Sequence, residues 1–152
     1  FFKSAGFMYE DLTNAELFIT MFYLQYDPVR GQIAYANAGH NPPLLLHHET
    51  GTFEELDAEG MILGITQEMV FEEKQTILQP GDILVLYTDG IIEAESNAMQ
   101  MYGIERLKAV IHENRELTAQ EIIDNTMNDA RMFQGRRHFN DDVTMIVLKI
   151  NL

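Results

Sequence analysis

Three aspartates stand beside two apolar runs of the chain. Asp89 closely follows the run "ILVLY" and is followed at once by Gly90, whereas Asp141 and Asp142 directly precede "VTMIVLKI". Carboxylate oxygens are the ligands that hard divalent cations prefer, and Mg²⁺ or Mn²⁺ commonly takes one or two carboxylates and completes its shell with water. These residue types therefore suit a divalent metal site, provided that the fold brings them together.

The apolar runs beside the aspartates are predicted strands. The run "ILVLY" is apolar on both faces, as in a strand that is covered on both sides, and such strands tend to present functional side chains at their ends. If the two strands are antiparallel neighbours, the end of the first lies beside the start of the second, and Asp89 comes next to Asp141. Two close carboxylates repel each other unless a cation lies between them. A divalent ion is then the natural occupant.

A plainer interpretation exists for the same residues. The pair Asp89-Gly90 is a strong signal for a two-residue β-hairpin turn. Aspartates also serve as turn and capping residues, so Asp141 and Asp142 need not contact a metal ion. On the residues alone, both interpretations stay open.

A further polar cluster, "YANAGHNPPLLL", holds Asn37, Gly39 and His40 at the end of a predicted strand. A lone histidine in such a place is more often a hydrogen-bonded loop residue than a ligand or a base. His47 and His48 are neighbours in a predicted strand and so point to opposite faces, which argues against joint metal binding. The sequence shows no order or spacing typical of a Ser-His-Asp triad, a zinc-binding helix, a phosphate loop or a dinucleotide fingerprint.

The composition excludes several classes of protein. The 152 residues carry a formal net charge of −14, which argues against a nucleic-acid partner because phosphate groups would be repelled. The absence of cysteine excludes a disulfide framework and a thiolate metal site. No apolar run approaches the roughly 20 residues of a membrane span, and no signal peptide is recognisable. We therefore expect a soluble, cytoplasmic protein without a membrane partner.

The first part of the chain is predicted to be β-structure, because aromatic and β-branched residues alternate with turn signals. The predicted strands cover residues 17–26, 32–39, 44–48, 52–56, 70–78 and 82–87. The first two are expected to pair as one hairpin, and the next two as another. Up to residue 89, the chain is therefore predicted to form a β-meander.

The sequence period changes beyond this point. Apolar residues from Ile104 to Ile111 have the spacing of one helical face. Thr118 and Glu121 form a capping box, which begins a second helix that is expected to end near Gly135. A last strand over residues 143–150 is predicted to lie in the centre of a sheet. Strands followed by helices and one more strand make an α+β pattern.

Four segments, taken in order, resemble one protein family. They are "FITMFYLQYDPVRGQIAYANAGHNPPLLL", "LQPGDILVLYTDGIIEAESN", "YGIERL" and "NDDVTMIVLKI". The chain is similar, over about residues 18–150, to the bacterial SpoIIE-type branch of the metal-dependent protein serine/threonine phosphatases, the protein phosphatase 2C-like (PPM) family. The resemblance implies an α+β fold of the protein phosphatase 2C type, an α-β-β-α sandwich.

One family motif has no counterpart in this sequence. The segment "GD-x-S-G-H-G" supplies the aspartate that bridges two metal ions in the family, and it is absent together with the strands and the long helix around it. Residues 1–152 are therefore expected to be a partial phosphatase domain, its C-terminal two-thirds, with the N-terminal strands and helix missing and no second domain. Sheet edges and apolar faces left uncovered in this way predict self-association.

The resemblance also implies roles for single residues. Asp89 and Asp141 match family aspartates that bind one of two Mn²⁺ or Mg²⁺ ions, so they are the expected catalytic residues. Asp142 is the second choice of metal ligand, and Gly90, which follows Asp89 in the same motif, is also expected at the metal site. In this partial domain, at most one weak metal site is expected, because most of the coordination would fall to water.

The implied reaction is hydrolysis of phosphoserine or phosphothreonine by a metal-activated water, without a covalent intermediate. Asn37 and His40 are expected in the active-site neighbourhood, since His40 falls where other branches carry an aspartate near an accessory metal. The expected substrate is a phosphorylated regulatory protein, a STAS-domain anti-anti-sigma factor, and the fragment alone is expected to be inactive. The alternatives are a non-catalytic interaction module that keeps the phosphatase fold and a metal-binding α+β domain of unrelated function.

Overall fold

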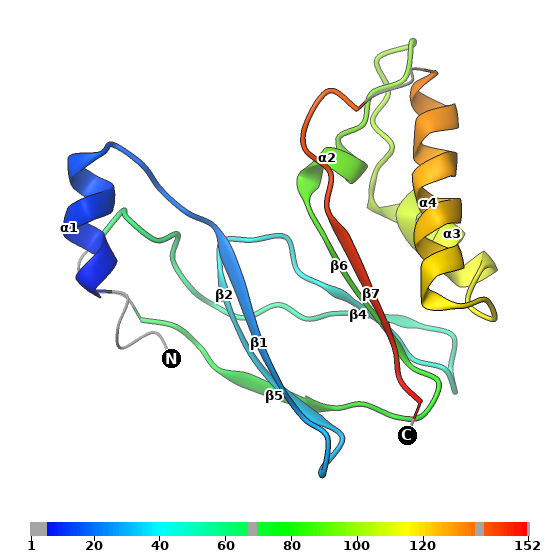
Figure 1. Ribbon diagram of the computed structural model, residues 1–152, viewed down its shortest axis with the longest axis horizontal. Coiled ribbons are helices and arrows are strands. Elements are labelled where there is room, and N and C mark those ends of the chain that lie inside the picture. The colour runs from blue at the N-terminus through cyan, green and yellow to red at the C-terminus, as the bar shows by residue number, and fades with distance from the viewer. Residues whose placement is uncertain (1–5, 67–69, 136–138, 152) are drawn as a thin grey trace. The chain divides into compact units, whose positions relative to one another are not determined.

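The computed structural model describes residues 6–66, 70–135 and 139–151 (Figure 1). The chain divides into two compact units. The first lies within Phe1–Pro42 and Leu56–Leu78, and the second within Pro43–Glu55 and Gln79–Leu152. In the part of the chain that the structure describes, no helix is long and apolar enough to cross a membrane.

The described residues of the first unit form one helix and a three-stranded antiparallel sheet in the order β1-β2-β5. Its elements are α1 (Gly6–Asn14), β1 (Met21–Asp27), β2 (Gln32–Ala38) and β5 (Lys74–Ile77). The predicted hairpin of β1 and β2 is confirmed, with a register that runs from Met21↔Ala38 to Asp27↔Gln32. The Asp27 carboxylate closes its turn by accepting hydrogen bonds from the backbone N–H groups of Val29 and Arg30.

In the second unit, the part of the chain that the structure describes forms a four-stranded antiparallel sheet in the order β4-β3-β6-β7 and three helices. Its strands are β3 (Leu44–Leu46), β4 (Phe53–Glu55), β6 (Ile83–Tyr87) and β7 (Met145–Lys149), and its helices are α2 (Asp89–Ile92), α3 (Ile104–Glu113) and α4 (Ala119–Gln134). The predicted β3–β4 hairpin is confirmed. Helix α4 packs on β7 and on α3, so this helical pair lies beside the β6–β7 pair (Figure 1).

Strand β6 is buried on both of its faces, as its continuous apolar run predicts. Ile83, Leu84 and Val85 are at most 1% exposed. Side chains of α3 and α4, among them Leu107 and Ile122, complete one apolar core with the sheet. The strand that leads to Asp89 is thus held rigidly inside the second unit.

The predicted helix ends of α4 are confirmed. The Thr118 hydroxyl accepts a hydrogen bond from the backbone N–H of Glu121, and the Glu121 carboxylate accepts one from the backbone N–H of Thr118. Gly135 ends the helix in the left-handed conformation, with φ of 66°. Glycine adopts this conformation without steric cost, which explains the stop at this residue.

The predicted β-meander is wrong. Strand β5 pairs with β2 instead of with its sequence neighbours β4 and β6, so the strands divide between two sheets. Local turn signals mark where a strand ends, but they do not determine which distant strand it joins, and the β3–β4 hairpin here separates β2 from its partner β5 in the sequence.

The central position predicted for the last strand is also wrong. Among the described residues, β7 has β6 as its one neighbour and lies at the edge of its sheet. Its outward side chains Ile146 and Leu148 are 50% and 44% exposed. The run is apolar on both faces although one face remains open, which the hydrophobic pattern alone does not reveal.

A charged cluster joins α3 to α4. Arg106 donates two hydrogen bonds to Asp129, from Nε at 2.8 Å and from Nη2 at 3.0 Å, and the Tyr102 hydroxyl donates a third at 2.8 Å. The Arg106 guanidinium also lies over the rings of Tyr102 and Phe133. The hydrogen bonds from Arg106 hold the pKa of the Asp129 carboxyl below its ordinary value, and burial together with the bond to Asp129 raises the pKa of Tyr102.

We expect Asp129→Asn to destabilise the chain by about 1 kcal/mol at neutral pH, because Arg106 loses its charged partner while solvent screens part of the effect. A carboxyl with a lowered pKa in the folded state contributes stability above its unfolded pKa, near 3.8, and loses it as the pH falls through the folded value. The difference between wild type and variant should therefore shrink in acid. Urea unfolding between pH 7 and pH 3 measures it.

Asp124→Asn on the same helix is the matched control, since Asp124 is exposed and, among the described residues, accepts only a hydrogen bond from Gln120. It should leave the free energy of unfolding nearly unchanged. Equal effects of the two substitutions at every pH would contradict the role assigned to Asp129.

Candidate functional site

The antiparallel pairing of β6 with β7 confirms the arrangement predicted from the two apolar runs. Tyr87 lies opposite Met145 at the last pair of the ladder, so the end of β6 and the start of β7 lie at the same end of the sheet. Asp89 belongs to the segment that leaves, and Asp141 and Asp142 belong to the segment that enters. All three aspartates are exposed.

The alternative of an Asp-Gly hairpin is wrong. Asp89 and Gly90 begin the short helix α2, and β6 pairs with β3 and β7, neither of which follows it through a two-residue turn. The continuous burial of β6 was the signal against the hairpin.

Gly90 allows the two segments to approach closely. A Cβ atom at this position would lie 2.5 Å from the carbonyl oxygen of Asp142 and 3.1 Å from a methyl carbon of Val143. Gly90 is buried, and its φ is not in the left-handed region, so the requirement is for space and not for backbone freedom. The structure therefore brings Gly90 into contact with the backbone beside Asp141.

The aspartate carboxylates differ in their local bonds. Asp141 Oδ1 accepts a hydrogen bond of 2.7 Å from the backbone N–H of the next residue, Asp142. Within the described residues, no hydrogen bond or ion pair engages the carboxylates of Asp89 and Asp142. Oxygen atoms of all three residues thus remain open to solvent and to a cation.

The donor chemistry of this end of the sheet fits Mg²⁺ or Mn²⁺, which accept carboxylates and water. The fit is partial. Residues 6–66, 70–135 and 139–151 contain no group of three or more histidine, aspartate or glutamate side chains that could hold a metal ion. An ion bound by these aspartates would have to complete its coordination with water or with other groups.

Asn37 and His40 belong to the first unit, whereas the aspartates belong to the second. The buried Asn37 side chain accepts a hydrogen bond from the backbone N–H of His40 at 2.8 Å and donates one to the His40 carbonyl oxygen at 2.9 Å. It also donates to Asp57, and His40 Nδ1 lies 3.3 Å from the Thr20 hydroxyl. His40 is thus a hydrogen-bonded loop residue, as its sequence context predicts.

Asp82 is a buried polar residue whose role sequence reasoning missed. It is 1% exposed and accepts hydrogen bonds from the backbone N–H groups of His48 and Gln79. It lies beside His47, whose Nε2 bonds Glu54 at 3.0 Å. Asp82 is the first residue of the predicted strand over residues 82–87, and its position directly after the turn residues Pro80 and Gly81 is the signal that could have identified it as an anchor for the turn.

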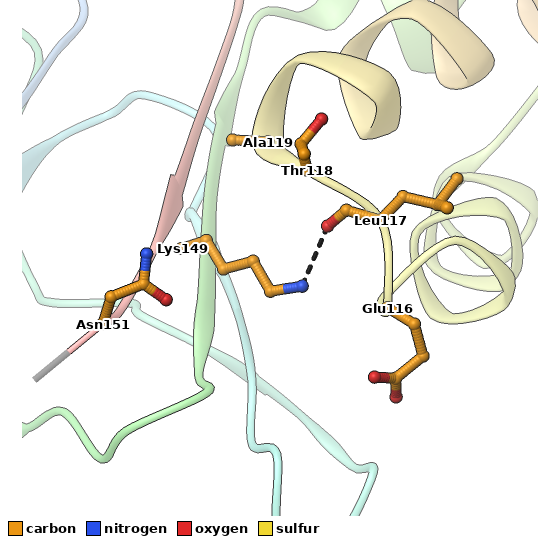
Figure 2. A pocket seen from close by; sticks show the side chains of 6 residues that line it. All are labelled: Glu116, Leu117, Thr118, Ala119, Lys149 and Asn151. Atoms are coloured by element: carbon orange, nitrogen blue, oxygen red, sulfur yellow. Dashed lines mark hydrogen bonds between the residues drawn. The ribbon is translucent and has the colours of Figure 1, made fainter.

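A pocket of about 360 Å³ lies at the opposite end of β7 from the aspartates (Figure 2). It is lined by Glu116, Leu117, Thr118, Ala119, Lys149 and Asn151. Lys149 donates hydrogen bonds to the carbonyl oxygens of Arg115 at 2.7 Å and Leu117 at 2.8 Å. Its ammonium group therefore fixes the α3–α4 connection, and this pocket does not include the predicted site.

The sequence profile of the family described as Stage II sporulation protein E (SpoIIE) matches residues 5–151. Phosphoserine phosphatase RsbU of Bacillus subtilis (strain 168) is 33% identical over 149 residues, which cover 97% of this chain and 43% of RsbU. The chain thus spans less than half the length of this relative.

Solved structures show the same fold at lower sequence identity. The SiaA-PP2C domain of Pseudomonas aeruginosa has a TM-score of 0.83 at 17% identity, over 98% of this chain and 58% of that one. The phosphatase domain of SpoIIE from Bacillus subtilis, described as Mn presoaked, has a TM-score of 0.63 at 21% identity, over 87% of this chain and 56% of that one. These likenesses confirm the predicted α+β fold of the PP2C type, and the profile match shows that the chain belongs to the SpoIIE family of PP2C-like phosphatases.

Proposed function

We propose that this chain is part of a protein serine/threonine phosphatase domain of the PP2C type, which hydrolyses phosphoserine or phosphothreonine in a protein. The observation that carries the proposal is the set of exposed aspartates where β6 ends and β7 begins, in a chain that is 33% identical to a phosphoserine phosphatase. We further propose residues 1–152 as the C-terminal two-thirds or so of such a domain, and the 58% coverage of the SiaA-PP2C domain supports this share.

Asp89 and Asp141 are the proposed metal ligands, with Asp142 as a second choice. When bound, Mn²⁺ or Mg²⁺ would supply an activated water and screen the charge of the phosphoryl oxygens. The residues of the chain would hold that ion at a fixed place, because Asp89 follows a strand that is buried on both faces and Gly90 keeps its segment against Asp142. The chain has a net charge of −14, which repels a phosphorylated substrate, and a bound cation would reduce this repulsion.

The proposed substrate is a phosphorylated regulatory protein, with a STAS-domain anti-anti-sigma factor as the class that the family resemblance favours. A non-catalytic interaction module with the phosphatase fold is the second candidate. The absence of a three-residue metal cluster among the described residues is the observation that favours this alternative.

Asp89→Asn should lower the affinity of the chain for Mn²⁺ by about tenfold or more, because even the loss of a group that supports a ligand often costs that much. Isothermal titration calorimetry of the purified chain measures the dissociation constant. Asp124→Asn, which removes an exposed carboxylate from α4, should leave it unchanged. Equal Mn²⁺ affinity in wild type and Asp89→Asn would contradict the assignment of Asp89 as a ligand.

Hydrolysis of a phosphoserine peptide in the presence of Mn²⁺ tests the activity itself. We expect this chain to be inactive and the same protein extended upstream by about 80 residues, enough for the rest of a domain of this size, to be active. Activity in neither form would favour the interaction module. Activity in both would mean that a carboxylate within this chain completes the site.

We also propose that the chain self-associates in solution. Within the described part of the second unit, β7 is an edge strand with Ile146 and Leu148 exposed, and in the first unit Phe18 and Ile65 are 68% and 57% exposed. Open edges and apolar surface favour association. Size-exclusion chromatography with light scattering should give a mass above that of one chain at high concentration, and a single monomeric peak there would contradict the proposal.

A further inference from the structure

Thr88 lies between the end of β6 and the start of α2, one residue before Asp89. Its backbone N–H donates a hydrogen bond of 3.0 Å to the carbonyl oxygen of Thr144. Its hydroxyl accepts one of 2.9 Å from the backbone N–H of Thr144 and donates one of 3.3 Å to the carbonyl oxygen of Asp142. One side chain thus bonds the segment that enters β7 at two points.

These bonds replace a more usual use of the same hydroxyl. Thr88 is the N-cap residue of α2, with extended backbone angles of φ −95° and ψ 160°, yet its side chain makes no capping hydrogen bond. A threonine in this position usually accepts from an N–H group in the first turn of its own helix. Here the hydroxyl bonds the segment that enters β7, so it fixes the distance between that segment and the end of β6.

The pairing of β6 with β7 ends at Tyr87↔Met145, and α2 begins directly beyond it. Without further bonds, the two segments would be free to separate at the point where the aspartates lie. The backbone N–H of Thr88 continues the connection by one residue, its hydroxyl extends the connection to Asp142, and the close contact of Gly90 with Asp142 adds to it. The residues on both sides of Asp89 therefore contact the segment that carries Asp141 and Asp142.

We propose that Thr88 is a positioning residue for the metal site, whose hydroxyl fixes the spacing between the backbone at Asp89 and the backbone at Asp141. This inference rests on the proposed function, because it assumes that these aspartates bind a divalent ion. Divalent metal sites need their ligands within a few tenths of an ångström of a set geometry, so a loosened spacing lowers affinity even when every ligand is present.

Thr88→Val tests the proposal, since valine keeps the branched shape of the side chain and replaces the hydroxyl with a methyl group. We expect it to weaken Mn²⁺ binding by about tenfold in calorimetric titrations, which is a typical cost of losing a group that orients a ligand. Thr88→Ser, which retains the hydroxyl, should restore the affinity to within about threefold of wild type by the same reasoning. Thr144→Val is the matched control, because the Thr144 side chain is exposed and none of the described hydrogen bonds uses its hydroxyl.

Hydrogen exchange without metal supplies a second readout. The Thr144 amide donates to the Thr88 hydroxyl, so its protection should fall in Thr88→Val and persist in Thr88→Ser. Should Thr88→Val fail to fold, Thr88→Ala replaces it in both measurements. A merely structural role would lower the melting temperature of the variant and leave the Mn²⁺ dissociation constant of the folded protein unchanged, which would overturn the proposal.

Comparison with Asp89→Asn distinguishes a failure of the proposed metal site from a failure of the proposed role of Thr88. Weakened binding in Asp89→Asn with unchanged binding in Thr88→Val would leave the metal site standing and remove the role of Thr88. Unchanged binding in both variants, or no detectable Mn²⁺ binding by wild type, would remove the proposed metal site and the role of Thr88 together.

Discussion

The antiparallel pairing of β6 with β7 is the constraint on which the candidate site depends. The two strands are distant in the sequence, and their register from Ile83↔Lys149 to Tyr87↔Met145 brings the chain around Asp89 to the chain around Asp142. Because β6 is buried on both faces, a shift of its register would move its side chains, among them Ile83 and Val85, out of the positions in which they are closely packed. The core thus determines which carboxylates share one end of the sheet.

The helices support this pairing from one side. Helix α4 packs on β7, and the cluster of Arg106, Asp129 and Tyr102 fixes α4 to α3. At the far end of β7, Lys149 bonds the connection between the same two helices (Figure 2). An edge strand with an open outer face is in this way held along its length by contacts on its inner face and at its end.

Much of this arrangement could be predicted from the sequence, because it follows from local patterns. The burial of β6, both hairpins and the two ends of α4 depend on apolar runs, turn residues and a capping box, all of which are contiguous in the sequence. The division of the strands between two sheets could not be predicted in this way, because the pairing of β5 with β2 spans a long stretch of chain. The role of Thr88 could not be predicted for the same reason, because it depends on carbonyl and amide groups more than 50 residues away. Asp82, by contrast, could have been identified locally, since it lies directly between the turn residues Pro80 and Gly81 and the apolar run of β6.

The division of the chain into two units has a consequence for how it can be dissected. Each unit is built from two separate stretches of sequence, and the chain passes from one unit to the other three times, after Pro42, Glu55 and Leu78. Any single proteolytic cut therefore leaves at least one unit shared between two fragments. Neither unit can be obtained whole by truncation from one end without splitting the other. A fragment released by limited proteolysis of this chain therefore does not correspond to an independent domain.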